Sequence, residues 1–235
     1  VSTIQSKGQG SFVEVLEKKQ FNPKFIVLSG FTGSGKTVLL EKLRANGFPV
    51  INFERMAGHR GSIFGHIGLN PSNQKRFDSL LVEKILEYEN EPFVFVEGES
   101  KRIGKVLIPE FIYEKKEKGL QLILQMPIEE RVKGLLEDYE PWNYSDNILE
   151  AYRLIKKHIH TPVAKEIEDF LQQGNYYEAT MLLLKYYYDP RYAFATKDFQ
   201  GEKTYIEAQN IDEAYEEIIA TLNARGLIKP NQFIS

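Results

Sequence analysis

The sequence contains no cysteine. Without a thiol the chain can form no disulfide, bind no metal through thiolates and carry no cysteine nucleophile. It also has no apolar run near the ~20 residues that a membrane-spanning helix needs, and its first residues show no secretory signal pattern. We therefore expect a protein of the cytoplasm that has no membrane partner.

A strong excess of charge of either sign is also missing. The formal net charge is -3 over 235 residues, which argues against a protein that coats nucleic acid uniformly. A nucleic-acid partner would need a local basic patch. The hydrophobic share of 42% and the charged share of 27% are ordinary for a globular protein. The length suits one large α/β domain, or a core domain with an inserted lobe.

What the sequence does contain is a complete phosphate-binding loop, G-x-x-x-x-G-K-T, at residues 30–37. An apolar strand is predicted before it and a helix after it. Glycines let backbone N–H groups turn toward phosphate oxygens, and the helix N-terminus adds its dipole. Lys36 supplies positive charge, and Thr37 supplies a hydroxyl suited to a metal ion. The predicted phosphate ligands in this loop are Gly30, Gly33, Ser34, Gly35, Lys36 and Thr37.

Strand and helix patterns alternate along most of the chain. This alternation predicts an α/β fold of the P-loop NTPase type, in which a parallel sheet is flanked by helices. Strands are predicted at 25–28, 49–53, 92–97, 120–126 and 204–208. Helices are predicted at 11–20, 38–45, 72–90 with Ser72 as its cap, 109–118 and 211–225.

The strand pattern disappears between residues 127 and 189. Helices are predicted there at 127–138, 145–158, 162–173 and 175–188. By fold-level analogy, a helical lobe inserted before the last strand resembles the lid or substrate lobe of small P-loop kinases. The predicted organisation is an N-terminal helical extension (1–24), a P-loop α/β core (25–126), a helical lobe (127–192), and a return strand with a C-terminal helix (193–235).

A polar, glycine-rich stretch, residues 59–65, follows the second predicted strand. Open α/β sheets bind ligands beyond the carboxyl ends of their strands. Arg60 offers a planar fork for phosphate, Ser62 adds a hydroxyl as a second predicted phosphate ligand, and His59 can exchange a proton near neutral pH. A flexible connector with incidental polar residues is the alternative. We favour a binding role because long polar loops inside compact domains are usually functional.

Two acids follow the most apolar strand. Glu97 ends that strand, where P-loop proteins carry the acid that orients magnesium or activates water, and Glu99 lies two residues on. A structural role for Glu97, capping a helix or pairing with Arg102, is the alternative. Magnesium would be held by Thr37 and Glu97. The candidate catalytic residues are Lys36, His59, Arg60, Glu97 and Glu99.

Together these stretches resemble the P-loop domain of tRNA 2-selenouridine synthase. The most specific agreement lies in residues 30–40 (GFTGSGKTVLL), 59–65 (HRGSIFG) and 97–104 (EGESKRIG) followed by Ile108-Pro109. Shorter agreements lie at 127–132, 138–139 and 187–192. The resemblance covers about residues 25–210.

The resemblance implies a transferase that modifies the wobble uridine of tRNA. Selenium from selenophosphate would replace the sulfur of 2-thiouridine, through a geranylated intermediate made from geranyl diphosphate. Both co-substrates carry phosphate groups, so the loop has a role without nucleotide hydrolysis, and Lys36 and Arg60 would stabilise the departing diphosphate. The helical lobe would act as a lid or bind tRNA. Predicted tRNA contacts are Lys101, Arg102, Lys105, Lys156 and Lys157.

The sequence departs from this family in one large respect. Members place a rhodanese domain with a catalytic cysteine ahead of the P-loop domain, where this sequence has about 24 residues and no cysteine. We therefore expect a missing rhodanese domain or a separate rhodanese partner, without which selenium exchange would not proceed. Smaller departures are Asn73 within Pro-Ser-x-Gln, and Gly98 where members often have an acid.

Two other functions stay open at this point. The chain could be a P-loop kinase for a small molecule or nucleotide, with ATP or GTP in the loop. It could instead be a non-catalytic module that binds tRNA or a protein partner. Intact Lys36, Thr37 and Glu97 speak against the second alternative.

Overall fold

The computed structural model describes residues 21–195 and 200–228. The helix predicted at 11–20 lies outside these ranges, as does most of the predicted N-terminal extension. In the described part of the chain, no helix is long and apolar enough to span a membrane.

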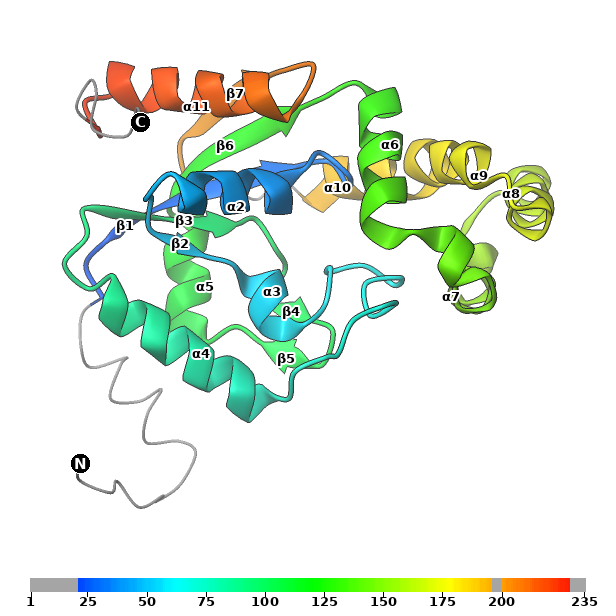
Figure 1. Cartoon of the computed structure of the whole chain (residues 1–235), viewed down its shortest axis with the longest axis horizontal. Coiled ribbons are helices and arrows are strands. Elements are labelled where there is room, and N and C mark those ends of the chain that lie inside the picture. Colours follow the sequence, from blue (N-terminus) through cyan, green and yellow to red (C-terminus); the bar gives the residue numbers. More distant parts are fainter. Residues whose placement is uncertain (1–20, 196–199, 229–235) are drawn as a thin grey trace.

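A five-stranded parallel sheet forms the centre of the molecule (Figure 1), in the order β2-β3-β1-β6-β7. Its central strand β1 enters the phosphate loop, and β3 lies beside it with Leu28 opposite Glu97. The predicted α/β fold with a parallel sheet is confirmed. The strands are β1 (Lys24–Gly30), β2 (Val50–Ile51), β3 (Phe93–Glu97), β6 (Leu120–Gln125) and β7 (Lys203–Glu207).

Helices cover both faces of this sheet, each burying an apolar stripe. On one face, α2 (Lys36–Ala45) and α11 (Ile211–Ala224) pack on β1 and β6 through side chains such as Leu40 and Ile218. Phe77 belongs to the core under the other face. The helices of that face are α3 (Phe53–Ala57), α4 (Gln74–Glu87) and α5 (Glu110–Glu117).

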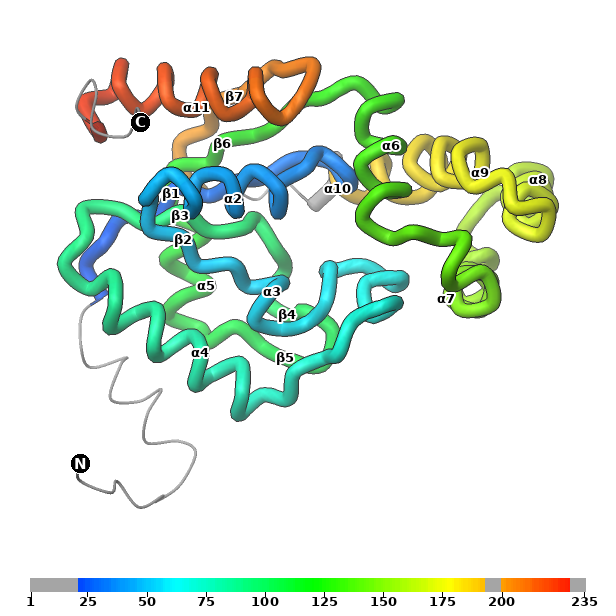
Figure 2. The backbone as a smooth tube through the Cα atoms, in the orientation of Figure 1, coloured from blue at the N-terminus to red at the C-terminus, as the bar shows by residue number. Residues whose placement is uncertain are grey.

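A group of helices leaves the sheet after β6 and returns to it at β7. It lies to one side of the sheet, beyond the phosphate loop (Figure 2), and has its own core around Tyr152 and Ile167. We call these helices the helical lobe. They are α6 (Ile128–Tyr139), α7 (Ser145–Ile155), α8 (Thr161–Gln173), α9 (Tyr176–Leu183) and α10 (Asp189–Ala195), with 3-10 turns at Pro141–Asn143 and Lys156–His158 and a π-helical turn at Leu184–Tyr188.

The structure corrects three details of the sequence prediction. The second strand ends at Ile51, because the Asn52 side chain accepts the Arg55 N–H and starts α3. Helix α4 is capped by Asn73, which accepts the Arg76 N–H at 2.9 Å, and Ser72 is not the cap. A short antiparallel hairpin, β4 (Arg102–Ile103) and β5 (Val106–Leu107), was not predicted.

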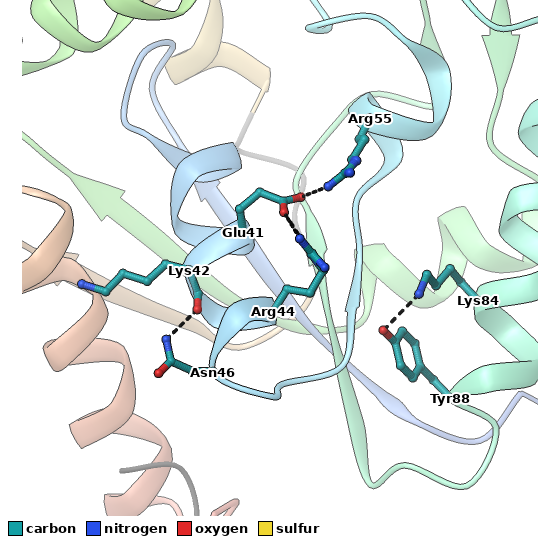
Figure 3. A network of polar contacts seen from close by, with 7 residues as sticks. All are labelled: Glu41, Lys42, Arg44, Asn46, Arg55, Lys84 and Tyr88. Atoms are coloured by element: carbon teal, nitrogen blue, oxygen red, sulfur yellow. Dashed lines mark hydrogen bonds and ion pairs between the residues drawn. The ribbon is translucent and has the colours of Figure 1, made fainter. Parts of the chain in front are cut away.

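Polar contacts join α2 to α3 beside the loop. Glu41 on α2 pairs with Arg55 on α3 at 2.9 Å and with Arg44 on its own helix at 2.7 Å (Figure 3). At the end of α2, the Asn46 amide donates to the Lys42 carbonyl at 2.8 Å. The Glu41–Arg55 pair thus links the first turn of α3 to the helix that follows the phosphate loop.

Candidate functional site

The phosphate loop joins β1 to α2 in a conformation that glycine alone accommodates. Gly33 and Gly35 have φ angles of +79° and +74°. A Cβ atom on Gly33 would lie 2.8 Å from the Arg131 carbonyl oxygen, and one on Gly35 would lie 2.2 Å from Ile211. Gly35 is also the N-cap of α2, so the free N–H groups at that helix start face the loop without a side-chain cap. Such a helix start favours a bound anion.

The polar side chains of the loop contact groups of the site itself. Lys36 folds back, and its Nζ donates to the Gly30 carbonyl at 3.1 Å. The Thr37 hydroxyl donates to Glu54 Oε2 at 3.0 Å. The Ser34 hydroxyl is buried and has no hydrogen-bond partner among the described residues. A phosphate group is an acceptor that could take hydrogen bonds from all three side chains.

Three carboxylates, which we call the acidic cluster, lie next to the loop: Glu54, Glu97 and Glu99. Glu97 ends β3 and is fully buried; one of its oxygens accepts the Glu54 N–H at 3.1 Å. Its other oxygen has no partner of good geometry in the described part of the chain. A Cβ atom on Gly61 would lie 2.5 Å from a Glu99 oxygen and 2.9 Å from a Glu54 oxygen. The second and third polar stretches of the sequence therefore meet here.

Burial and mutual repulsion raise the pKa values of these acids. Burial raises the pKa of Glu54 to about 7, Glu99 adds to the rise, and Lys36 and the Thr37 hydrogen bond oppose it. Burial, followed by the charges of Glu54 and Glu99, raises the pKa of Glu97 well above its usual range. Perturbed acids that lie next to a binding loop are typical of functional sites. A bound cation or a proton would relieve this repulsion.

Arg60 lies near the acidic cluster, but its guanidinium is engaged elsewhere. Its two Nη atoms donate to the carbonyls of Ile67 and Asp138, each at 2.8 Å, and its Nε pairs with the Asp138 carboxylate at 2.7 Å. The guanidinium also lies 4.5 Å from the centre of the Tyr139 ring. In this arrangement Arg60 holds its loop against the end of α6, and its contact with phosphate stays a prediction.

The other polar residues of this stretch also make contacts within the protein. His59 Nδ1 accepts the Gly61 N–H at 3.1 Å, and a Cβ atom on Gly104 would lie 2.6 Å from the His59 ring. Burial lowers the pKa of His59, with smaller effects from His66 and Arg60. The neutral ring is therefore favoured near pH 7. The Ser62 hydroxyl lies 3.0 Å from the Tyr139 hydroxyl.

An apolar cavity of about 70 Å³ lies between the phosphate loop and the helical lobe. Thr32 of the loop, Ser62 and Phe64 line part of it, and mostly apolar side chains of α6, α7, α8, α9 and the π-helical turn line the rest. The Tyr188 hydroxyl on its wall is buried and has no hydrogen-bond partner among the described residues. Sequence analysis did not predict this cavity, because its lining comes from segments far apart in the chain.

The predicted basic residues fall into two groups on different elements. Lys101 pairs with Glu110 beside the β4–β5 hairpin, and Lys156 pairs with Glu168 on the helical lobe. The remaining members are exposed, and no ion pair is found for them in the part of the chain that the structure describes. They are Arg102, Lys105 and Lys157.

Glu54 is the acid that sequence analysis did not single out. It lies in the first turn of α3, directly after the second strand. The signal available in the sequence was Asn52, because asparagine often caps a helix. A helix that starts at Asn52 has Glu54 in its first turn, where acids are favoured.

A model of the family described as the tRNA 2-selenouridine synthase AAA domain matches residues 23–225. An uncharacterized protein of Methanocaldococcus jannaschii is 30% identical over 175 residues, covering 70% of this chain and 77% of that protein. The tRNA 2-selenouridine synthase of Nitrosomonas eutropha is 33% identical over 131 residues, 54% of this chain and 33% of that protein. That of Shewanella woodyi is 29% identical over 218 residues, 80% of this chain and 58% of that protein.

Two solved structures are similar to this chain at a low level. TT1252 from Thermus thermophilus has 17% identity and a TM-score of 0.39, with 87% of this chain and 98% of that chain covered. A gluconokinase from Sinorhizobium meliloti has 16% identity and a TM-score of 0.37, with 87% and 93% covered.

The matched region begins before β1, contains the phosphate loop and the acidic cluster, and ends after α11. The chain spans 33% and 58% of the length of the two selenouridine synthases just named. On the strength of the family match, this chain belongs to the tRNA 2-selenouridine synthase AAA domain family.

Proposed function

We propose that this chain is the phosphate-handling part of an enzyme that modifies the wobble 2-thiouridine of tRNA. The observation that carries the proposal is the intact loop from Gly30 to Thr37, with Lys36 and the start of α2 beside a cluster of perturbed acids. Family membership supports a tRNA substrate, since relatives of this chain bear the name tRNA 2-selenouridine synthase. The phosphate group bound in the loop would belong to a co-substrate.

Geranyl diphosphate is the co-substrate that the cavity supports best. Its diphosphate would bind the N–H groups of the loop, and its hydrocarbon tail would enter the apolar cavity. The two sites are contiguous, because Thr32 belongs to the loop and also lines the cavity. A ligand with a charged head and an apolar tail needs such a pair of neighbouring sites.

Geranyl transfer requires the loop to stabilise a departing diphosphate. The sulfur of 2-thiouridine would attack the first carbon of the geranyl group; a carbon–sulfur bond forms, the carbon–oxygen bond breaks, and the diphosphate leaves. The N3 proton of the base is released. Lys36 and the preorganised N–H groups would stabilise the charge that builds on the leaving diphosphate.

Selenium exchange would follow at the alkylated base. Alkylation turns the sulfur into a better leaving group. The selenium of selenophosphate would attack C2 of the base; a carbon–selenium bond forms, the carbon–sulfur bond breaks and geranyl thiol leaves. Water would then cleave the selenium–phosphorus bond and release phosphate. We propose that a rhodanese-type protein provides the thiol for selenium transfer, because a thiolate is the usual protein carrier and this sequence contains no cysteine.

A magnesium ion fits the oxygen donors at the loop. Within residues 21–195 and 200–228, no three His, Asp or Glu side chains are placed to hold a metal ion unaided. Magnesium, however, usually takes one or two carboxylates together with ligand phosphates. Thr37 and Glu97, with Glu54 between them, would hold such an ion, whose charge would offset that of the diphosphate.

A thermal-shift screen tests the proposed function against the kinase alternative. A ligand at a hundred times its dissociation constant adds about 2.7 kcal/mol of stability. We expect geranyl diphosphate and inorganic diphosphate to raise the melting temperature more than ATP or GTP. Stabilisation by ATP alone, with turnover to ADP and a phosphorylated acceptor, would favour a kinase and contradict the proposal.

A further inference from the structure

One buried arginine holds the outer tip of the phosphate loop. Arg131 lies near the start of α6 and is only 3% exposed. Its Nε donates to the Thr32 carbonyl at 2.9 Å. Its two Nη atoms donate to the two carboxylate oxygens of Asp189 at 3.0 Å and 2.6 Å. All three nitrogens of the guanidinium therefore have partners, and one of them is the loop itself.

Aromatic packing completes this contact. The Arg131 guanidinium lies 5.0 Å from the centre of the Phe31 ring, and the Phe31 ring lies 5.0 Å from that of Tyr192. Gly33 fits against the backbone of α6, where a Cβ atom would lie 2.8 Å from the Arg131 carbonyl. Residues 31–33 are thus held between α6 and α10, the first and last helices of the helical lobe.

The cost of burying the Arg131 guanidinium indicates that its pairing with Asp189 has a specific role. Removing a guanidinium from water is expensive, and its partner Asp189 is 25% exposed, so the pair is weak evidence for stability alone. The bidentate geometry fixes orientation, which lysine cannot reproduce. Here the bidentate contact with Asp189 orients the Arg131 guanidinium. The same guanidinium also holds the Thr32 carbonyl, at the tip of the loop proposed to bind phosphate.

The same pair reaches the wall of the apolar cavity. Asp189 directly follows the π-helical turn Leu184–Tyr188, and both end residues of that turn line the cavity. Thr32, whose carbonyl Arg131 holds, lines it from the other side. Short π-helical turns are often found at functional sites. The ion pair therefore joins the tip of the phosphate loop to the helical segment that forms the cavity.

We propose that Arg131 and Asp189 are positioning residues that hold the phosphate loop in its binding conformation and thereby set its affinity for diphosphate. Without the pair, residues 31–33 lose their hydrogen bond and the support of the guanidinium, and the neighbouring N–H groups are no longer preorganised. The inference rests on the proposed function insofar as it takes the loop to be the phosphate site.

The test compares Asp189→Asn with Lys133→Gln in the full chain. Asn has nearly the shape of Asp, but its NH2 group is a donor, so it cannot replace the two oxygens that accept from the Arg131 Nη atoms. Lys133 is an exposed residue of the same helix that pairs with Glu130, so its substitution controls for a charge change on α6. Titration calorimetry with inorganic diphosphate gives the dissociation constant, and hydrogen exchange without ligand reports on the amides of residues 31–35.

We expect Asp189→Asn to weaken diphosphate binding by about tenfold or more, the order of one charged hydrogen bond, and to speed exchange at residues 31–35. Lys133→Gln should leave both unchanged. Arg131→Lys, which keeps the charge but not the fork, should behave like Asp189→Asn; it is the second variant if Asp189→Asn does not fold.

A lower melting temperature with unchanged affinity and unchanged exchange at 31–35 would overturn the inference, because the pair would then serve stability alone. The two proposals fail separately. If wild type binds no diphosphate, the proposed function is wrong and the predicted effect on affinity falls with it. Unchanged loop exchange in both Asp189→Asn and Arg131→Lys overturns the positioning role whatever the ligand.

Discussion

The Thr37 hydroxyl donates a hydrogen bond to the Glu54 carboxylate, with 3.0 Å between Oγ1 and Oε2. This contact joins the first turn of the helix that follows the phosphate loop to the acidic cluster at the ends of β2 and β3. Glu54 in turn donates its backbone N–H to Glu97. A ligand that enters the loop therefore meets a hydroxyl and two carboxylates that are already connected.

Lys36→Ala should weaken the binding of diphosphate by about 1 kcal/mol or more, the magnitude of a hydrogen bond to a charged group. Lys36 is the charged side chain of the loop, and its Nζ donates to the Gly30 carbonyl. Calorimetry with inorganic diphosphate measures the effect. Lys42→Ala is the matched control, since Lys42 is on the same helix and pairs with Asp212. Equal affinity of folded Lys36→Ala and wild type would contradict the prediction.

The raised pKa of Glu54 predicts a pH dependence of stability. Because burial raises this pKa from 4.5 to about 7, the folded protein holds a proton that the unfolded chain releases at lower pH. The free energy of unfolding should therefore fall as pH rises from about 4.5 to about 7. Glu54→Gln removes this contribution, so its stability relative to wild type should increase across that window.

Denaturant unfolding at several pH values measures this difference. Glu91→Gln, at an exposed position before β3, is the control. Its free energy of unfolding should change with pH in the same way as that of wild type. The pKa of Glu97 shifts in the same direction. Glu97 is present in wild type and in Glu54→Gln, and in both it makes the free energy of unfolding fall as pH rises. A constant difference between Glu54→Gln and wild type from about pH 5 to about pH 8 would refute the prediction.

Binding of tRNA should depend on salt and on the exposed basic residues more than on the paired ones. Arg102→Glu and Lys105→Glu should weaken binding, whereas Lys101→Ala should have a smaller effect because Lys101 is paired with Glu110. Each lost phosphate contact should reduce the slope of log affinity against log salt by about 0.7 to 0.9. Titration of an anticodon stem-loop at several salt concentrations measures these slopes; salt-insensitive binding is the contrary result.

Filling the apolar cavity should weaken binding of the geranyl tail and leave binding of the diphosphate unchanged. Thr180 lines the cavity from α9, and Thr180→Phe would occupy part of its volume. We expect this variant to bind geranyl diphosphate at least about tenfold more weakly, as a loss of about 1.4 kcal/mol of apolar burial implies, and inorganic diphosphate with unchanged affinity. An equal loss of affinity for geranyl diphosphate and for inorganic diphosphate would show that the cavity does not hold the tail.

Much of the fold was predictable because its signals are local. The apolar run of β3, the glycines of the loop and the periodicity of α2 and α4 each arise within a few consecutive residues. The five-residue helix α3 was missed because it begins directly after β2, and its start depends on the cap formed by Asn52. The hairpin β4–β5 has strands of only two residues, too short to show alternation.

Most residues of the site could be predicted from the sequence, but their contacts with one another could not. The sequence indicated that polar stretches after two strands would lie near the loop, since the ends of parallel strands meet at one edge of the sheet. It could not indicate that Arg60 would be engaged by Asp138, 78 residues further along the chain. For the same reason it gave no role to Arg131, whose partner Asp189 lies 58 residues away.

The most direct test of the central claim is the mass of the modified nucleoside. The purified chain is incubated with tRNA that contains 2-thiouridine and with geranyl diphosphate, the tRNA is digested, and its nucleosides are analysed by mass spectrometry. We predict geranylated 2-thiouridine with wild type and a strong reduction with Lys36→Ala. Unmodified thiouridine with the folded wild-type protein, at concentrations where both substrates bind, would contradict the claim.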